Sequence, residues 1–142
     1  MNFKAILVVA GEPHSIFLEI FFKSLQKNKF RKPIILIASK NLLLEQMKSL
    51  KFNLKIKLIN NINIEIEELN NNFINLINID YKFTHAFQKI SPKSSKYINE
   101  CFEIALEIIS KNNNFALING PINKKSFLNG KTLGITEYLA KK

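Results

Sequence analysis

The stretch FALINGPINKKSFLNGKTLGITEYL, residues 115–139, contains three of the four glycines in this 142-residue chain. It begins with four apolar residues, 115–118, which predict a short buried strand. Gly120 and Pro121 follow and permit a tight turn into a helix, because glycine tolerates unusual backbone angles and proline suits a first helical turn. Residues 123–125 are Asn-Lys-Lys at that helix N-terminus, where free N–H groups favour anions. The stretch therefore predicts a strand, a turn and a helix that present a site for a phosphorylated or carboxylated ligand.

The chain before this stretch alternates between apolar strand patterns and helical periodicity. A first strand, a helix with apolar residues at helical spacing and a second strand are followed by another helix and a half-exposed strand. Strands separated by helices must cross over to pair in parallel, so this order predicts an α/β fold with parallel strands. The predicted strands are residues 3–9, 34–38 and 54–58, and the predicted helices are residues 16–25 and 42–51.

The second half of the chain is rich in asparagine before its strongest helix. Residues 60–88 predict one or two peripheral strands, Asn-rich loops and little chemistry. A helix with one apolar face then runs to Lys111, and we interpret Ser94 and Ser95 at its start as capping residues. Asn41 is the expected cap of the earlier helix.

Composition indicates one domain and argues against several classes of function. The net charge is +10, yet all basic residues except Arg31 are lysines scattered along the chain, which argues against nucleic-acid binding. No apolar run is long enough to span a membrane and no signal peptide is recognisable, so we expect a cytoplasmic protein without membrane contacts. Cys101, the single cysteine, is expected to be a reduced core thiol.

The segment after the first strand, Gly11-Glu12-Pro13, lies where α/β proteins place ligand loops. It has one glycine, so it is not a dinucleotide fingerprint, and we interpret it as a local turn rather than a catalytic segment. His14 has no partner nearby in sequence, and His85 is expected at the surface or in packing. The two histidines and one cysteine are far apart in sequence, so we expect no metal site from this chain alone.

Two motifs carry a family resemblance. Residues 120–125, GPINKK, and residues 134–140, GITEYLA, resemble the GPINK and GHTEYLA motifs of the 4-hydroxythreonine-4-phosphate dehydrogenase family. The turn at residues 11–13 and the helix at Ser94 match that family in the same order. The resemblance implies an α/β fold like that of isocitrate and isopropylmalate dehydrogenases, a mixed sheet flanked by helices, here incomplete. It also implies NAD-dependent oxidation and decarboxylation of 4-phosphooxy-L-threonine to 3-amino-2-oxopropyl phosphate, in pyridoxal phosphate (vitamin B6) biosynthesis.

The resemblance also implies roles for particular residues. Thr136 matches the family's substrate-binding threonine, and Ile135 occupies the position of a substrate-binding histidine. Isoleucine removes a hydrogen-bond donor there, which is worth about 1 kcal/mol or more. Lys124 is a third candidate on other grounds, because the turn directs at least one of the two lysines toward the carboxyl end of the strand, where α/β sheets bind ligands. The family binds NAD and a divalent metal such as Zn, Mg or Co, and it forms homodimers.

We expect residues 1–142 to be the N-terminal part of such a dehydrogenase, ending before the metal ligands and most NAD contacts of the family. No catalytic residue is therefore assigned in this chain, which we expect to be inactive alone. Two alternatives remain: a standalone α/β module that binds small phosphorylated ligands, and an interaction domain without catalysis.

Overall fold

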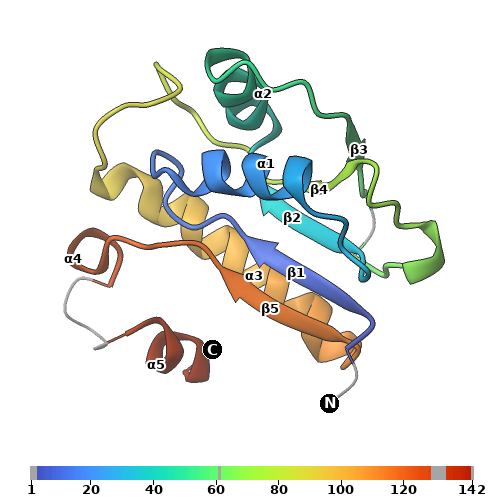
Figure 1. Ribbon diagram of the computed structural model, residues 1–142. Helices are drawn as coiled ribbons and strands as arrows, with labels where there is room; N and C mark the ends of the chain where they lie inside the picture. Colours follow the sequence, from blue (N-terminus) through green and yellow to red (C-terminus); the bar gives the residue numbers. More distant parts are fainter. Residues whose placement is uncertain (1–2, 61, 129–133, 142) are drawn as a thin grey trace.

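A computed structural model describes residues 3–60, 62–128 and 134–141 (Figure 1). Within these residues five strands form one sheet in the order β3-β4-β2-β1-β5, and every pairing is parallel. The predicted α/β class is confirmed, and the antiparallel pairing of a mixed sheet does not occur in this part of the chain. The strands are β1 (Ala5–Val9), β2 (Ile34–Ala38), β3 (Ile56–Leu58), β4 (Ile74–Asn78) and β5 (Phe115–Asn119).

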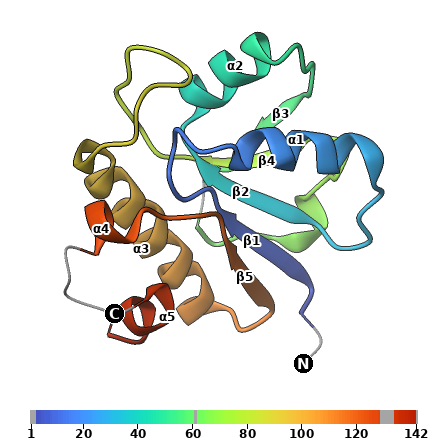
Figure 2. The same ribbon diagram turned by 60° about the vertical axis from the view of Figure 1, so that its left-hand side comes forward.

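Helices cover both faces of the sheet (Figure 2). One face packs against α1 (Phe17–Lys27) and α2 (Lys40–Ser49), and the other packs against α3 (Ser95–Lys111). Two short helices, α4 (Lys124–Phe127) and α5 (Ile135–Ala140), lie beside α3. The remaining helical turns are the 3₁₀ helices η1 (Ile66–Glu68) and η2 (Pro92–Ser94).

The central strands are apolar because side chains on both of their faces are buried. Along β1, Leu7 and Val9 join the core beneath α3, while Val8 joins the core beneath α1 and α2. All five residues of β2 are buried. This two-sided burial explains why residues 3–9 and 34–38 are readable as strands from the sequence.

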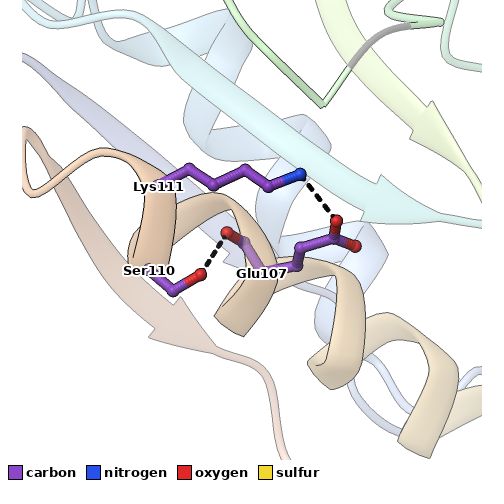
Figure 3. A network of polar contacts seen from close by, with 3 residues as sticks. All are labelled: Glu107, Ser110 and Lys111. Atoms are coloured by element: carbon purple, nitrogen blue, oxygen red, sulfur yellow. Dashed lines mark hydrogen bonds and ion pairs between the residues drawn. The ribbon is translucent and has the colours of Figure 1, made fainter.

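The outer face of α3 carries two ion pairs. Lys96 and Glu100 are 3.7 Å apart, and Lys111 Nζ lies 2.8 Å from Glu107 Oε1. Figure 3 shows the second pair, together with the Ser110 hydroxyl donating to the Glu107 carbonyl oxygen at 2.8 Å. Both pairs are exposed, so each contributes only about 0.3–0.5 kcal/mol.

The Asn-rich region contains an internal strand, which corrects the expectation of peripheral strands and loops. β4 lies between β3 and β2, and its Asn75 is fully buried. The Asn75 amide donates to Ile34 O at 3.0 Å and accepts from Asn70 N–H at 3.2 Å. These bonds compensate the cost of burying a polar side chain, so an asparagine that suggests a loop can lie within a buried strand.

Two further local expectations are corrected. The side chain that caps α2 belongs to Ser39, whose Oγ accepts from Leu42 N–H at 3.4 Å, and not to Asn41. β5 forms as predicted but is the edge strand of the described sheet, and Ile118 is 49% exposed rather than buried. An apolar run does not distinguish an edge strand from a central one.

The turns after β1 and β5 meet backbone to backbone. Gly11 has a φ of +75°, and a Cβ at this position would lie 2.4 Å from Pro121 O. A Cβ on Gly120 would lie 2.2 Å from Ala10 O. Glu12 N–H donates to Pro121 O at 2.8 Å and thereby fixes the contact. Glycine is required at both positions because any side chain would force the two turns apart.

We predict that Gly120→Ala lowers the free energy of unfolding by about 1–3 kcal/mol or more, because its methyl group overlaps a backbone carbonyl. Gly134→Ala is the matched control, since no atom lies within 4 Å of its added Cβ and its backbone is extended. That control should cost less than about 1 kcal/mol. Urea unfolding followed by circular dichroism measures both, and equal losses would contradict the contact.

Candidate functional site

The carboxyl ends of β1 and β5 form a topological switch point. The chain leaves β1 for α1 on one face of the sheet, whereas it leaves β5 for α4 beside α3 on the other (Figures 1 and 2). Open α/β sheets bind ligands at such points. We call residues 10–16, 79–91 and 120–123, which follow β1, β4 and β5, the strand-end loops.

Glu12 is a buried carboxyl group within these loops. Its residue is 3% exposed, and Oε2 lies 3.0 Å from Ser94 Oγ. Among the described residues Oε1 has no hydrogen-bond partner. Burial raises the pKa of Glu12, and hydrogen bonds from the Ser94 hydroxyl and the His14 backbone oppose this rise.

His14 is also buried and has a partner that is distant in sequence. Its Nδ1 lies 3.3 Å from Ala86 O, and its Nε2 lies 3.1 Å from the Tyr81 hydroxyl. A carbonyl oxygen only accepts, so Nδ1 carries the proton and Nε2 accepts from Tyr81. Burial lowers the pKa of His14, while burial and the Glu12 charge raise the pKa of Tyr81. Both effects favour a neutral pair.

Gln46 of α2 joins two of the strand-end loops. It is fully buried, and its Nε2 donates to Pro13 O and to Ala86 O, both at 2.9 Å. Its Oε1 has no partner among the described residues. We call Glu12, His14, Gln46, Tyr81 and Ser94 the loop clamp, because their bonds connect the loop after β1 with the segment that leads into α3.

Sequence reasoning missed most of the loop clamp. Ser94 was expected to cap α3, but its hydroxyl makes no capping bond and contacts Glu12 and Ser91 O instead. His85 is exposed as expected. Cys101 is a free, buried thiol as expected, and burial raises its pKa to about 12.

The three predicted substrate residues lie outside the loop clamp. Lys124 is the exposed first residue of α4, and Thr136 is exposed in the first turn of α5. Ile135 is partly buried against the core beneath α3, and α5 is attached to α3 by a hydrogen bond from the Tyr138 hydroxyl to Asn99. The structure thus leaves Lys124 and Thr136 accessible and places Ile135 in packing.

A small pocket lies beside the strand-end loops. Its volume is about 360 Å³, and three lysines and two acidic residues line it together with Tyr81 and Tyr97. A larger pocket of about 600 Å³ is formed by residues 25–30, 54–55 and 71–74, beyond the opposite ends of the strands. The charged residues of the smaller pocket are Lys82, Lys93, Lys96, Asp80 and Glu100.

The residues present do not fit a metal or a dinucleotide. Within residues 3–60, 62–128 and 134–141, no three His, Cys, Asp or Glu side chains are grouped closely enough to hold a metal ion. In a dinucleotide fold, glycine lets the backbone approach the pyrophosphate. Here Pro121 O fills the space beside Gly11, so Gly11 serves packing between turns. No helix in the described part of the chain is long and apolar enough to cross a membrane.

Most of the chain matches the model of a known protein family. Residues 29–142 match the model of the pyridoxal phosphate biosynthetic protein PdxA. This chain belongs to the PdxA family. No curated protein matches the chain in a sequence search.

Solved structures show the same fold. A 4-hydroxythreonine-4-phosphate dehydrogenase from Burkholderia phymatum superposes with a TM-score of 0.81 at 19% identity, over 99% of this chain. The structure of a putative 4-hydroxythreonine-4-phosphate dehydrogenase from Salmonella typhimurium superposes with a TM-score of 0.76 at 21% identity. The 4-hydroxythreonine-4-phosphate dehydrogenase from Klebsiella pneumoniae superposes with a TM-score of 0.78 at 22% identity, and both comparisons cover 97% of this chain. In all three comparisons the PdxA-family chain spans 44% of the other protein's length.

We predict that Gln46→Met destabilises the protein by about 1–3 kcal/mol, because it removes the side-chain donor to the buried Pro13 O and one of the two donors to Ala86 O. Gln26→Met, the same change at an exposed position of α1, should alter stability by less than about 0.5 kcal/mol. Thermal unfolding of both variants measures the difference. If Gln46→Met is as stable as the wild type, the loop clamp does not hold the loops.

Proposed function

We propose that this chain is the substrate-binding part of an NAD-dependent 4-hydroxythreonine-4-phosphate dehydrogenase in pyridoxal phosphate biosynthesis. The family match over residues 29–142 carries the proposal. The motifs at residues 120–125 and 134–140 support it, as do the three solved structures of the same fold.

The reaction proposed is oxidation of the secondary alcohol of 4-phosphooxy-L-threonine. In this reaction the alcohol carbon would lose a hydride and the hydroxyl oxygen would lose a proton. The resulting β-keto acid then loses carbon dioxide to give 3-amino-2-oxopropyl phosphate. When bound, NAD supplies the hydride acceptor and a divalent metal polarises the new carbonyl group. The residues described here do not fit either group, so we propose that other parts of the complete enzyme hold them.

Within this chain the proposed roles are binding and orientation. Lys124 offers an exposed ammonium group for the phosphate or carboxylate of the substrate, and the exposed hydroxyl of Thr136 can donate a hydrogen bond to it. Ile135 contributes packing in place of the family's histidine. We further propose a cytoplasmic homodimer as the complete enzyme.

We predict that the purified 142-residue chain forms no NADH when incubated with 4-phosphooxy-L-threonine, NAD and Zn²⁺, Mg²⁺ or Co²⁺. The Klebsiella pneumoniae dehydrogenase, assayed under the same conditions, is the positive control. Metal-dependent NADH formation by the chain alone would contradict the proposal that other parts of the complete enzyme hold NAD and the metal. Saturable binding of the substrate by the isolated chain, measured by calorimetry, would agree with the binding role proposed for Lys124 and Thr136.

The same proposal predicts a second segment in the source genome. This segment should carry the metal ligands and most of the NAD contacts that the family resemblance implies, either in frame after the codon for Lys142 or as a separate gene. Co-expression of the chain with that segment should restore NADH formation. A genome without such a segment, or a folded complex without activity, would refute the dehydrogenase assignment.

A further inference from the structure

The hydroxyl group of Ser94 contacts two oxygen atoms, one on Glu12 and one on Ser91. Ser94 Oγ lies 3.0 Å from Glu12 Oε2 and 2.9 Å from Ser91 O. A hydroxyl group has one proton to donate, and the Ser91 carbonyl oxygen can only accept. Both contacts can be full two-centre hydrogen bonds only if a second proton lies between Glu12 and Ser94, because a single hydroxyl proton would have to be shared between two acceptors.

An ionised Glu12 leaves this arrangement unsatisfied. The single hydroxyl proton of Ser94 would point to the carboxylate, and the contact between Ser94 Oγ and Ser91 O would then join two acceptors. Glu12 Oε1 would be a buried anionic oxygen without a partner among the described residues. A carboxyl group that keeps its proton lets Glu12 donate to Ser94 and Ser94 donate to Ser91 O, and it leaves the unpartnered Oε1 uncharged.

Burial of Glu12 favours the uncharged form and outweighs the hydrogen bonds from Ser94 and the His14 backbone. Glu12 is 3% exposed and forms no ion pair with the described residues. The titratable groups on the segments around it are His14 and Tyr81 of the loop clamp and the buried Tyr97 of α3. Lys93, which precedes Ser94, and the first two residues of α4, Lys124 and Lys125, have exposed side chains. None of the three forms an ion pair with Glu12. Burial of an unpaired carboxylate is unfavourable.

We propose that Glu12 remains protonated at a pH where an exposed glutamate is ionised, and that this neutral acid is a positioning residue of the strand-end loops. Its side chain connects the loop after β1 to the start of α3, while its backbone N–H holds the turn after β5 through Pro121 O. Ionisation breaks the proton chain and loosens the junction of these three segments. The inference does not depend on the dehydrogenase activity.

A ¹³C NMR titration of the glutamate carboxyl carbons tests the proposal. The Glu12 signal, assigned by through-bond correlations, should titrate above the value of about 4.3 for an exposed glutamate. A midpoint at or below about 4.3 would overturn the proposal. This experiment uses the wild-type chain, so it does not depend on the folding of a variant.

The pH dependence of stability provides a second readout with a defined sign. A raised pKa means that the folded state holds the Glu12 proton more tightly than the unfolded state does. The resulting stability is fully present below the pKa of the unfolded chain and is lost as the pH rises through the pKa of the folded chain. Glu12→Gln is neutral at every pH, so its midpoint urea concentration should rise relative to that of the wild type as the pH rises above about 4.3, the value for an exposed glutamate. The exposed control Glu45→Gln should run parallel to the wild type over this range. A constant offset between Glu12→Gln and the wild type would contradict a proton held by Glu12.

Discussion

The direct contact between two backbone turns is the constraint on which the carboxyl edge of the sheet depends. Gly11 and Gly120 allow the turns after β1 and β5 to touch, and each glycine lies where a Cβ would overlap a carbonyl oxygen of the other turn. Since the chain leaves these neighbouring strands for opposite faces, the contact fixes the switch point from which the strand-end loops extend. The loop clamp then holds those loops against α2 and α3.

This constraint shapes the chemistry that the chain can provide. The glycine of the first turn is used for packing, so it does not create the open backbone that a dinucleotide requires. The buried side chains of the loop clamp bond to one another or to the backbone, while Lys124 and Thr136 remain exposed. The described residues thus combine a bonded interior with two exposed side chains to which we assign a binding role by proposal. This agrees with a PdxA-family chain that spans 44% of the structurally similar dehydrogenases.

The sequence predicted the parts of the fold that depend on local apolar patterns. β1, β2 and α3 were recognisable because burial on one or both faces requires apolar residues, which form a continuous run in the strands and a helical repeat in α3. β4 was misjudged because tertiary hydrogen bonds satisfy Asn75 inside the sheet. The site was less predictable: Glu12 and Ser94 are 82 positions apart, and His14 and Tyr81 are 67 apart. Neither pair follows from spacing. Roles for Lys124, Ile135 and Thr136 came from motif resemblance and stay predictions.

Amide hydrogen exchange measured by NMR tests the contact between the two turns most directly. Glu12 N–H donates to Pro121 O and Gly120 N–H donates to Val9 O, both at 2.8 Å. If the turns form one rigid junction, these two amides will exchange as slowly as the amides within β1, because they open only when the sheet opens. Exchange of the Glu12 amide at the rate of an exposed loop, with β1 still protected, would show that the turns separate readily and would contradict this account.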